Sequence, residues 1–226
     1  MDKKAFSLVR KFIKAKPWLI LGTVVLLLAL SFGEQQLSAV LTTAGLTYAD
    51  VGLAVIRMIL QSALMTVLVL SWHRRSDTAA PFAAIDILKL FLSTFLLTLA
   101  YTACVVTVVL IPLAVWLFLR TDFYMNYYIT GKSNGVFSCI GTSFRRTKGH
   151  AKRYLIYNVK YLLFYFLIQF ALAGVAMAKV AVQFPDTVST ALDIFDLVFT
   201  SVFMPYRFLL KCGFYETYLH KEANNG

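Results

Sequence analysis

Charged residues are scarce in this chain of 226 residues, and acidic residues are the scarcest of them. Asp, Glu, Lys and Arg together make up 15% of the chain, whereas soluble globular domains carry about a quarter. Hydrophobic residues make up 59%, and the mean hydropathy is +0.71. A soluble fold of this length could not bury so much apolar surface. The composition therefore excludes an ordinary soluble domain and indicates an integral membrane protein.

Sequence motifs for catalysis are absent as well. The chain contains no HExxH, GxSxG, Walker or GxGxxG pattern, so it lacks the spacings that metalloproteases, hydrolases and nucleotide-binding enzymes use. Asp122 and Asp193 could supply the two aspartates of an intramembrane protease, but the motifs that flank such aspartates are missing. We therefore expect no enzyme activity and assign no catalytic residue.

Metal ligands are also few. The three cysteines, Cys104, Cys139 and Cys212, are too scattered for a metal or redox motif, and we expect free thiols. His150 has no Cys, Asp or Glu near it in the sequence, whereas a zinc site needs three or four ligands at suitable spacing. We expect neither a metal nor a cofactor.

Long apolar runs recur along the chain, and about 20 apolar residues are needed to cross the hydrocarbon of a bilayer as a helix. We predict an all-α integral membrane protein, a six-span helical bundle that forms one domain over residues 1–226. The predicted spans are about 17–33, 50–72, 87–109, 112–129, 154–178 and 188–210. Residues 34–48 are expected to form an outer loop or an interfacial helix. The basic N-terminus has the outline of a signal peptide, but it lacks a small-x-small cleavage site, which favours a retained first helix.

The fourth span is the least regular of the six. Pro112 provides the break that separates it from the third span, and Arg120 and Asp122 fall inside it. A four-span alternative therefore stays open, in which the third and fourth spans merge with an interfacial piece.

Basic residues are distributed unequally between the predicted loops. If both termini are cytoplasmic, 19 of the 22 Lys and Arg residues lie in or next to cytoplasmic segments, and only Arg57, Arg120 and Lys179 do not. Cytoplasmic loops of membrane proteins are enriched in Lys and Arg. We therefore predict a multi-pass protein of the bacterial cytoplasmic membrane with its N- and C-termini inside.

Two segments outside the spans have amphipathic patterns. In residues 3–16, Phe6, Val9 and Ile13 share one helix face, and in the segment of about 135–148 the apolar face carries Phe137, Ile140 and Phe144. We expect both segments to form helices that lie on the inner leaflet with their apolar sides in the lipid.

A strongly basic stretch follows the second amphipathic segment. It is a candidate surface for lipid phosphate or for a partner protein, and its residues are Arg145, Arg146, Lys148, His150, Lys152 and Arg153. A net charge of +11 is compatible with nucleic-acid binding, but the chain contains no recognisable nucleic-acid-binding module. The expected partners are therefore anionic lipids of the inner leaflet, together with a membrane protein or a second copy of this chain, and not nucleic acid.

Five charged residues interrupt the apolar runs, namely Arg57, Arg120, Asp122, Asp193 and Asp196. Charges in hydrocarbon are costly and usually face a partner, a cavity or water. Asp193 and Asp196 are three residues apart and share a helix face, so we hypothesise that one of them pairs with Arg57. Two interpretations stay open, a structural or interfacial role and a polar cavity for a substrate or an ion.

Several short motifs in the second half occur in a fixed order. They are IPL at 111–113, DFYMNYY at 122–128, SFRRTKGHAKRYL at 143–155 and MPYRFLLKCGFYETYL at 204–219. With these motifs the chain resembles a bacterial integral-membrane family, the domain-of-unknown-function family numbered nine-seven-five. Leu113 stands where that family has a turn glycine, and GKSNG replaces its Asp-x-Pro. The resemblance implies a multi-span membrane fold, places a Gly-His-Lys-like signature at Gly149 and His150, and implies no reaction.

These observations favour a non-enzymatic accessory or scaffold protein that acts with lipid or with another membrane complex. The alternative is a small transporter or channel-like module that uses the intramembrane Arg and Asp charges. A membrane enzyme that acts on lipid ranks third, because no catalytic constellation supports it.

Overall fold

The computed structural model describes residues 2–43, 49–75, 77, 79–106, 111–131, 135–181 and 186–220. Most of these residues are helical, and no strand occurs among them, which confirms the all-α prediction. The helices are α1 (Asp2–Ala15), α2 (Pro17–Thr43), α3 (Ala49–Arg75), α4 (Ala84–Val106), α5 (Ile111–Thr121), α6 (Tyr124–Ile129), α7 (Val136–Arg146), α8 (Ala151–Ala181) and α9 (Asp186–Phe214), which continues into the π-helical turn η2 (Tyr215–Leu219).

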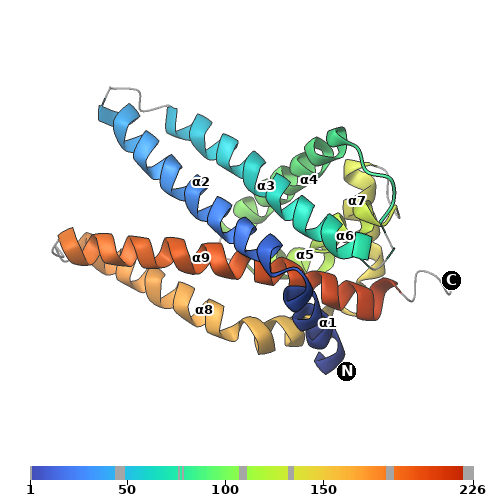
Figure 1. Ribbon diagram of the computed structural model, residues 1–226. Coiled ribbons are helices and arrows are strands. Elements are labelled where there is room, and N and C mark those ends of the chain that lie inside the picture. The colour runs from blue at the N-terminus through green and yellow to red at the C-terminus, as the bar shows by residue number, and fades with distance from the viewer. Residues whose placement is uncertain are drawn as a thin grey trace.

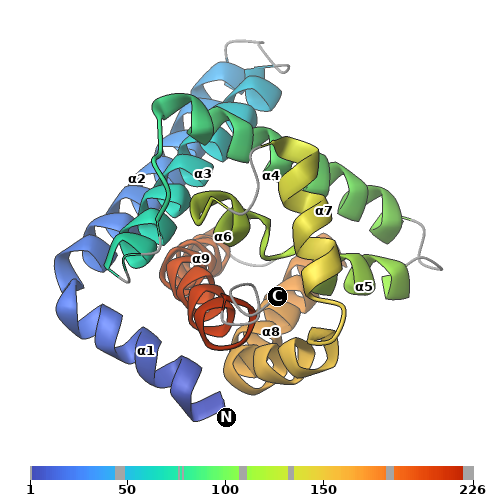
Figure 2. The same cartoon turned by 90° about the vertical axis from the view of Figure 1, so that its right-hand side faces the viewer.

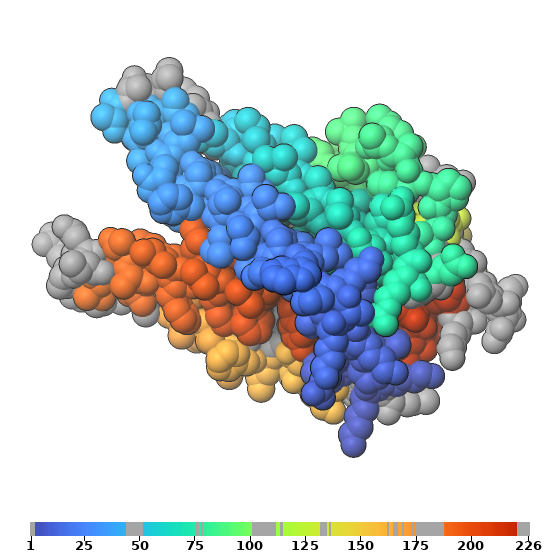
Figure 3. All heavy atoms as spheres, viewed as in Figure 1, coloured from blue at the N-terminus to red at the C-terminus, as the bar shows by residue number. Residues whose placement is uncertain are grey.

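Three helical hairpins diverge from a common end of the molecule. They are α2–α3, α4–α5 and α8–α9, and the end from which they diverge also holds α1, α6, α7 and η2 (Figures 1 and 2). The space-filling view shows the notch that separates the far ends of α2 and α9 (Figure 3). The hairpins are therefore held together mainly at one end, which we call the base.

The end of α9 is the centre of the base. In Figure 2 it is surrounded by α1, α6, α7 and α8, and its residues from Leu209 to Tyr215 are buried. The indole of Trp72, at the end of α3, donates a hydrogen bond of 2.9 Å to Glu216 in η2. The ring of Phe12 in α1 packs at 5.0 Å on that of Trp72. Helices from both ends of the sequence thus meet around one buried segment.

Three helices are long and apolar enough to cross a membrane, in the part of the chain that the structure describes. They cover Pro17–Thr43, Gly52–Arg75 and Val188–Leu219 and coincide with the predicted first, second and sixth spans. The first helix runs through to Thr43, so most of the segment expected as an outer loop or interfacial helix continues the span. Helices α4 and α8, of 23 and 31 residues, occupy the positions of the third and fifth predicted spans.

The predicted fourth span is wrong as a single helix. Residues 112–129 fold instead as α5 and α6, which are separated by a turn at Asp122 and Phe123. Helix α5 has 11 residues and is about 16 Å long, about half the thickness of the hydrocarbon. Helix α6 is buried along its whole length. The break is tolerated because its polar groups are buried in protein and not exposed to lipid.

The base has further polar anchors around α6. The Tyr128 hydroxyl donates a hydrogen bond of 2.6 Å to Asp86 at the beginning of α4. Ala80 donates its backbone N–H to the Ile129 carbonyl at 2.9 Å. Gly131 has a φ of +69°, and a Cβ there would lie 2.9 Å from that of Ala80. Glycine is therefore required at this turn.

Both predicted amphipathic helices form, but their inner faces pack on protein. In α1 the buried residues are Ala5, Val9 and Phe12, which lie against α9 and neighbouring elements of the base. In α7 the fully buried side chains include Cys139 and Ser143, while Phe137 is 80% exposed and Ile140 and Phe144 are half-buried. The expectation that the apolar side lies in lipid is therefore wrong for most of the α1 face, whereas for α7 it stays a prediction.

The contact between α1 and α9 yields a first prediction. A Cβ at Gly213 would lie 2.8 Å from the Ala5 carbonyl oxygen and 3.0 Å from a methyl carbon of Val9. We expect Gly213→Ala to lower the free energy of unfolding by about 1–3 kcal/mol, because the overpacked helices must separate. Thermal unfolding in detergent measures the effect.

Gly174 provides the matched control for this prediction. It lies inside α8, and an added Cβ there would meet no atom within 4 Å. Gly174→Ala should therefore be neutral or stabilising by up to about 1 kcal/mol, since alanine favours the helix. Equal stabilities of the two variants would contradict the packing of α1 on α9.

Candidate functional site

A buried ion pair lies at the break between α5 and α6. Lys211 of α9 donates to Asp122 at 2.8 Å, and the two side chains are 8% and 7% exposed. The Tyr154 hydroxyl of α8 donates to the other oxygen of the same carboxylate. One carboxylate thus joins the break to both helices of the α8–α9 hairpin.

The ion pair forms the floor of a cavity of about 730 Å³ between α3, α4, α5–α6 and α9. At the floor the lining residues Met65, Asp122 and Lys211 are buried. At the mouth the lining residues Val55 and Thr98 are exposed. The cavity therefore begins at the base and opens where the α2–α3 and α4–α5 hairpins diverge.

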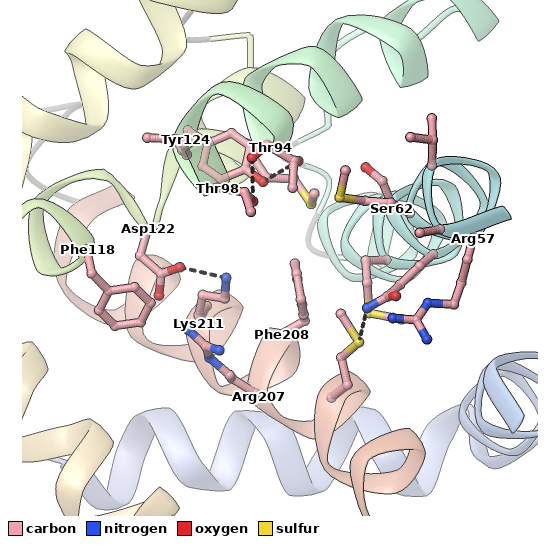
Figure 4. Close-up of a pocket in the computed structure, with 18 residues that line it drawn as sticks. Arg57, Ser62, Thr94, Thr98, Phe118, Asp122, Tyr124, Arg207, Phe208 and Lys211 are labelled. Carbon is pink, nitrogen blue, oxygen red and sulfur yellow. Dashed lines mark hydrogen bonds and ion pairs between the residues drawn. The ribbon is translucent and has the colours of Figure 1, made fainter. Parts of the chain in front are cut away.

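Cations outnumber anions on the walls of the cavity. The charged residues that line it are Arg57, Asp122, Arg207 and Lys211, three cations and one carboxylate. Figure 4 shows Asp122, Arg207 and Lys211 on one side, with Arg57 and Ser62 across from them. Arg207 and Lys211 are one helical turn apart on α9, and both act electrostatically on Asp122.

Arg57 has a different partner from the predicted one. It pairs with Glu34 of α2 at 2.5 Å, with its side chain 44% exposed. The predicted pairing with Asp193 or Asp196 is therefore wrong. Both aspartates are exposed on α9, where Asp196 accepts a hydrogen bond of 3.2 Å from Thr200. The sequence predicted an outer loop or an interfacial helix from Glu34 onward, whereas α2 continues past Glu34 to Thr43 and presents it to α3.

Arg120 is buried and holds α7 against α5. Its guanidinium donates to the Phe144 carbonyl at 2.8 and 2.6 Å, and it lies 4.3 Å from the centroid of the Phe144 ring. In return, Ser143 and Thr147 donate to the Arg120 carbonyl at 2.9 and 2.8 Å. These hydroxyls explain why small polar residues of α7, and not Phe137, face the interior. Arg120 is therefore structural and does not line the cavity.

The basic stretch lies on the surface of the base. Arg145, Arg146, Lys148, Lys152 and Arg153 are exposed, while His150 is half-buried. The turn between α7 and α8 contains Gly149, as expected. The exposed cations of α1, together with Lys16, which follows it, belong to the same end of the molecule, and those of α1 are Lys3, Lys4, Arg10, Lys11 and Lys14. We call these two sets together the basic collar.

The three histidines gather around η2. The rings of His73 and His220 lie 5.6 and 5.9 Å from the ring of Tyr215, and the ring of His150 lies 6.4 Å from that of Tyr218. His73 also shares a hydrogen bond of 2.9 Å with Asn126. Within the described residues, no three His, Cys, Asp or Glu side chains are placed to hold a metal ion. The cluster therefore belongs to the packing of the base.

Comparison of the chain with protein-family models, with curated proteins and with solved structures finds no match. The resemblance to family nine-seven-five stays a prediction from its motifs. The function must therefore be argued from the geometry of the cavity and of the collar.

Sequence analysis did not identify Arg207, Lys211 or Tyr154 as site residues. A signal was present, because Arg207 and Lys211 are two cations four residues apart inside an apolar stretch of the last span. Such a pair shares one helix face. Lys211 was interpreted as the cytoplasmic end of that span, whereas it is buried and holds Asp122.

The buried ion pair yields a second prediction. Asp122→Asn leaves Lys211 buried without its counter-charge, so we expect the free energy of unfolding to fall by about 3–5 kcal/mol. The double variant Asp122→Asn with Lys211→Met should recover much of this loss, because it removes the isolated charge. Thermal unfolding of the single and double variants measures the coupling.

Glu34→Gln serves as the control for an exposed pair. Because Arg57 is largely exposed, removal of its partner should change the free energy of unfolding by less than about 1 kcal/mol. If Asp122→Asn cost no more than Glu34→Gln, the ion pair would not be the anchor described here.

Proposed function

We propose that the chain is a non-enzymatic multi-pass protein of the bacterial cytoplasmic membrane, and that it acts as an accessory or scaffold with lipid or another membrane complex. The observation that carries the proposal is that the surface divides into an apolar region along the hairpins and a cationic region at the base. Large apolar side chains are exposed along the hairpins, for example Val25, Ile56, Phe170 and Ile194. Exposed cations form the basic collar at the base. A position of the hairpins in the hydrocarbon explains the exposed apolar side chains, and a position of the basic collar at the anionic leaflet explains the exposed cations.

In the proposed topology the base faces the cytoplasm and the chain crosses the membrane six times. Helices α2, α3, α4, α8 and α9 make five crossings. The remaining one is the broken passage of α5 and α6, whose polar turn is shielded by protein. The positions of α1 and η2 at the same end of the molecule support an even number of crossings (Figure 1).

A thiol-labelling experiment tests this topology. In a background without native cysteines, Lys148→Cys should react with a membrane-impermeant maleimide only in opened cells. Thr47→Cys, Val108→Cys and Gln183→Cys should react in intact cells, because the proposed topology assigns the segments between the hairpin helices to the outer side. Protection of Val108→Cys alone would favour the four-span alternative, and labelling of Lys148→Cys in intact cells would contradict the orientation.

Native-lipid purification tests the accessory function. The protein is extracted with its surrounding lipid in polymer nanodiscs, and mass spectrometry identifies what co-purifies. We expect enrichment of anionic lipid or of a membrane complex. Each cation near the surface contributes about 1 kcal/mol of attraction to anionic lipid, so Gln at Arg145, Arg146, Lys148 and Lys152 should reduce lipid enrichment several-fold.

The collar variant should unfold at the same temperature as the original chain, because the four altered side chains are exposed. Recovery of the protein with neither lipid nor protein enriched would count against the scaffold.

A transporter or channel-like module is the second candidate. The cavity of about 730 Å³ with cations on its walls favours it, because polar cavities between helices are typical of substrate pathways. Uptake of a soluble anion by proteoliposomes would favour this candidate over the scaffold.

A further inference from the structure

Arg207 contributes a cation without an anion to the cavity between α3, α4, α5–α6 and α9. Its Nε is buried without a hydrogen-bond acceptor, and no carboxylate among the described residues lies within ion-pair distance of it. Its guanidinium lies 4.9 Å from the centroid of the Phe118 ring. Arg207 is half-buried, and the contact with the ring does not replace the hydrogen-bond acceptor that its buried Nε lacks. Because Lys211 already holds Asp122, the floor carries one positive charge in excess.

A second polar group on the cavity wall also lacks a partner. Ser62 of α3 is 6% exposed, and its hydroxyl has no hydrogen-bond partner. It faces the cavity from the side opposite Arg207 (Figure 4). Buried polar groups are normally satisfied, so two such groups from different helices around one cavity indicate a ligand with acceptor oxygens.

The remaining side chains that line the cavity determine the chemistry of the rest of the ligand. It is mainly apolar and includes Val55, Met58, Leu97 and Phe208. The volume of about 730 Å³ is in the usual range for small-molecule sites, about 300–1,000 Å³. At the mouth Val55 is exposed on α3, on the apolar outer surface of the hairpin. An anionic head with an apolar tail satisfies both parts of the cavity.

We propose that this cavity holds one anionic phospholipid, with its phosphate against Arg207 and its chains leaving between α3 and α4. The proposal rests on the membrane location argued above, because the mouth must open into hydrocarbon. Guanidinium and phosphate form strong charge-assisted hydrogen bonds, and the Ser62 hydroxyl can donate to an ester oxygen from the opposite wall. A zwitterionic lipid fits less well, because its own cation would enter a site that already has positive charge in excess.

The test is retention of lipid by the full-length chain. The protein is reconstituted in nanodiscs of phosphatidylglycerol and phosphatidylcholine in equal amounts, released into mild detergent, and analysed by native mass spectrometry. We expect one phosphatidylglycerol to be retained for each chain. Arg207→Leu should reduce this retention about tenfold, as expected for the loss of one charged hydrogen-bonding group. Arg207→Lys, which keeps the charge, should retain most of it.

Two further variants distinguish lipid retention by the cavity from other causes of a change in retention. Arg75→Leu is the matched control, because Arg75 also lies near an aromatic ring, 6.0 Å from the centroid of Phe12, but neither lines the cavity nor belongs to the basic collar. It should leave retention unchanged. Thr98→Trp narrows the mouth at an exposed position and should lower retention without removing a charge, which keeps the test valid if Arg207→Leu does not fold. Equal retention by the original chain, Arg207→Leu and Thr98→Trp would overturn the proposal.

A soluble phosphate ester is the other ligand that could place a phosphate against Arg207. Glycerol phosphate at millimolar concentration should not displace the retained lipid, because it leaves the apolar walls unfilled. Displacement would overturn the lipid assignment in favour of a soluble phosphate ester. Failure of the original chain to enter nanodiscs would count against the proposed membrane function, whereas entry without selective retention would overturn only the cavity assignment.

Discussion

The buried ion pair between Asp122 and Lys211 is the constraint on which the rest of the base depends. It places a carboxylate at the break between α5 and α6, and Tyr154 binds the same carboxylate from α8. A carboxylate at this depth would be costly without its counter-charge, so the break, the end of α9 and the beginning of α8 must stay together. The short α5 and the buried α6 follow from this arrangement.

Because the helical hairpins pack together mainly at the base, space is left between them at the opposite end of the molecule. The hairpins meet at the base through η2, α1 and α7, and they diverge beyond it (Figures 1 and 2). The cavity lies where the divergence begins, so its floor contains the groups of the ion pair and its walls contain the apolar faces of α3 and α4. The anchor and the candidate site are thus two consequences of the same packing.

The long apolar helices could be predicted from the sequence, but only part of the site could. Arg57 and Asp122 were candidates, whereas Arg207 and Lys211 were not. Hydrocarbon requires a run of apolar residues within one segment, and this local requirement identified α2, α3 and α9. The turn at Asp122 depends on Lys211, 89 residues later in the chain. Local sequence patterns do not show which residues so far apart in the chain come into contact. Arg57 was recognised as a residue in need of a partner. Its partner was misjudged because α2 continues through Glu34, where the polar composition suggested an outer loop or an interfacial helix.

The roles of the cations are also difficult to predict from the sequence. Some set the membrane topology and others lie inside the protein, and composition does not distinguish the two. A cation that sets topology must reach water or lipid headgroups, and the exposed residues of the basic collar do so. Lys211 is buried with a carboxylate, and the Nε of Arg207 is buried with no acceptor. Lys211 therefore does not satisfy the condition for a topology signal, although it lies near the basic end of α9. The burial of Lys211 is explained by the ion pair, whereas Arg207 is half-buried and the proposed phospholipid would supply the acceptor that its buried Nε lacks among the described residues.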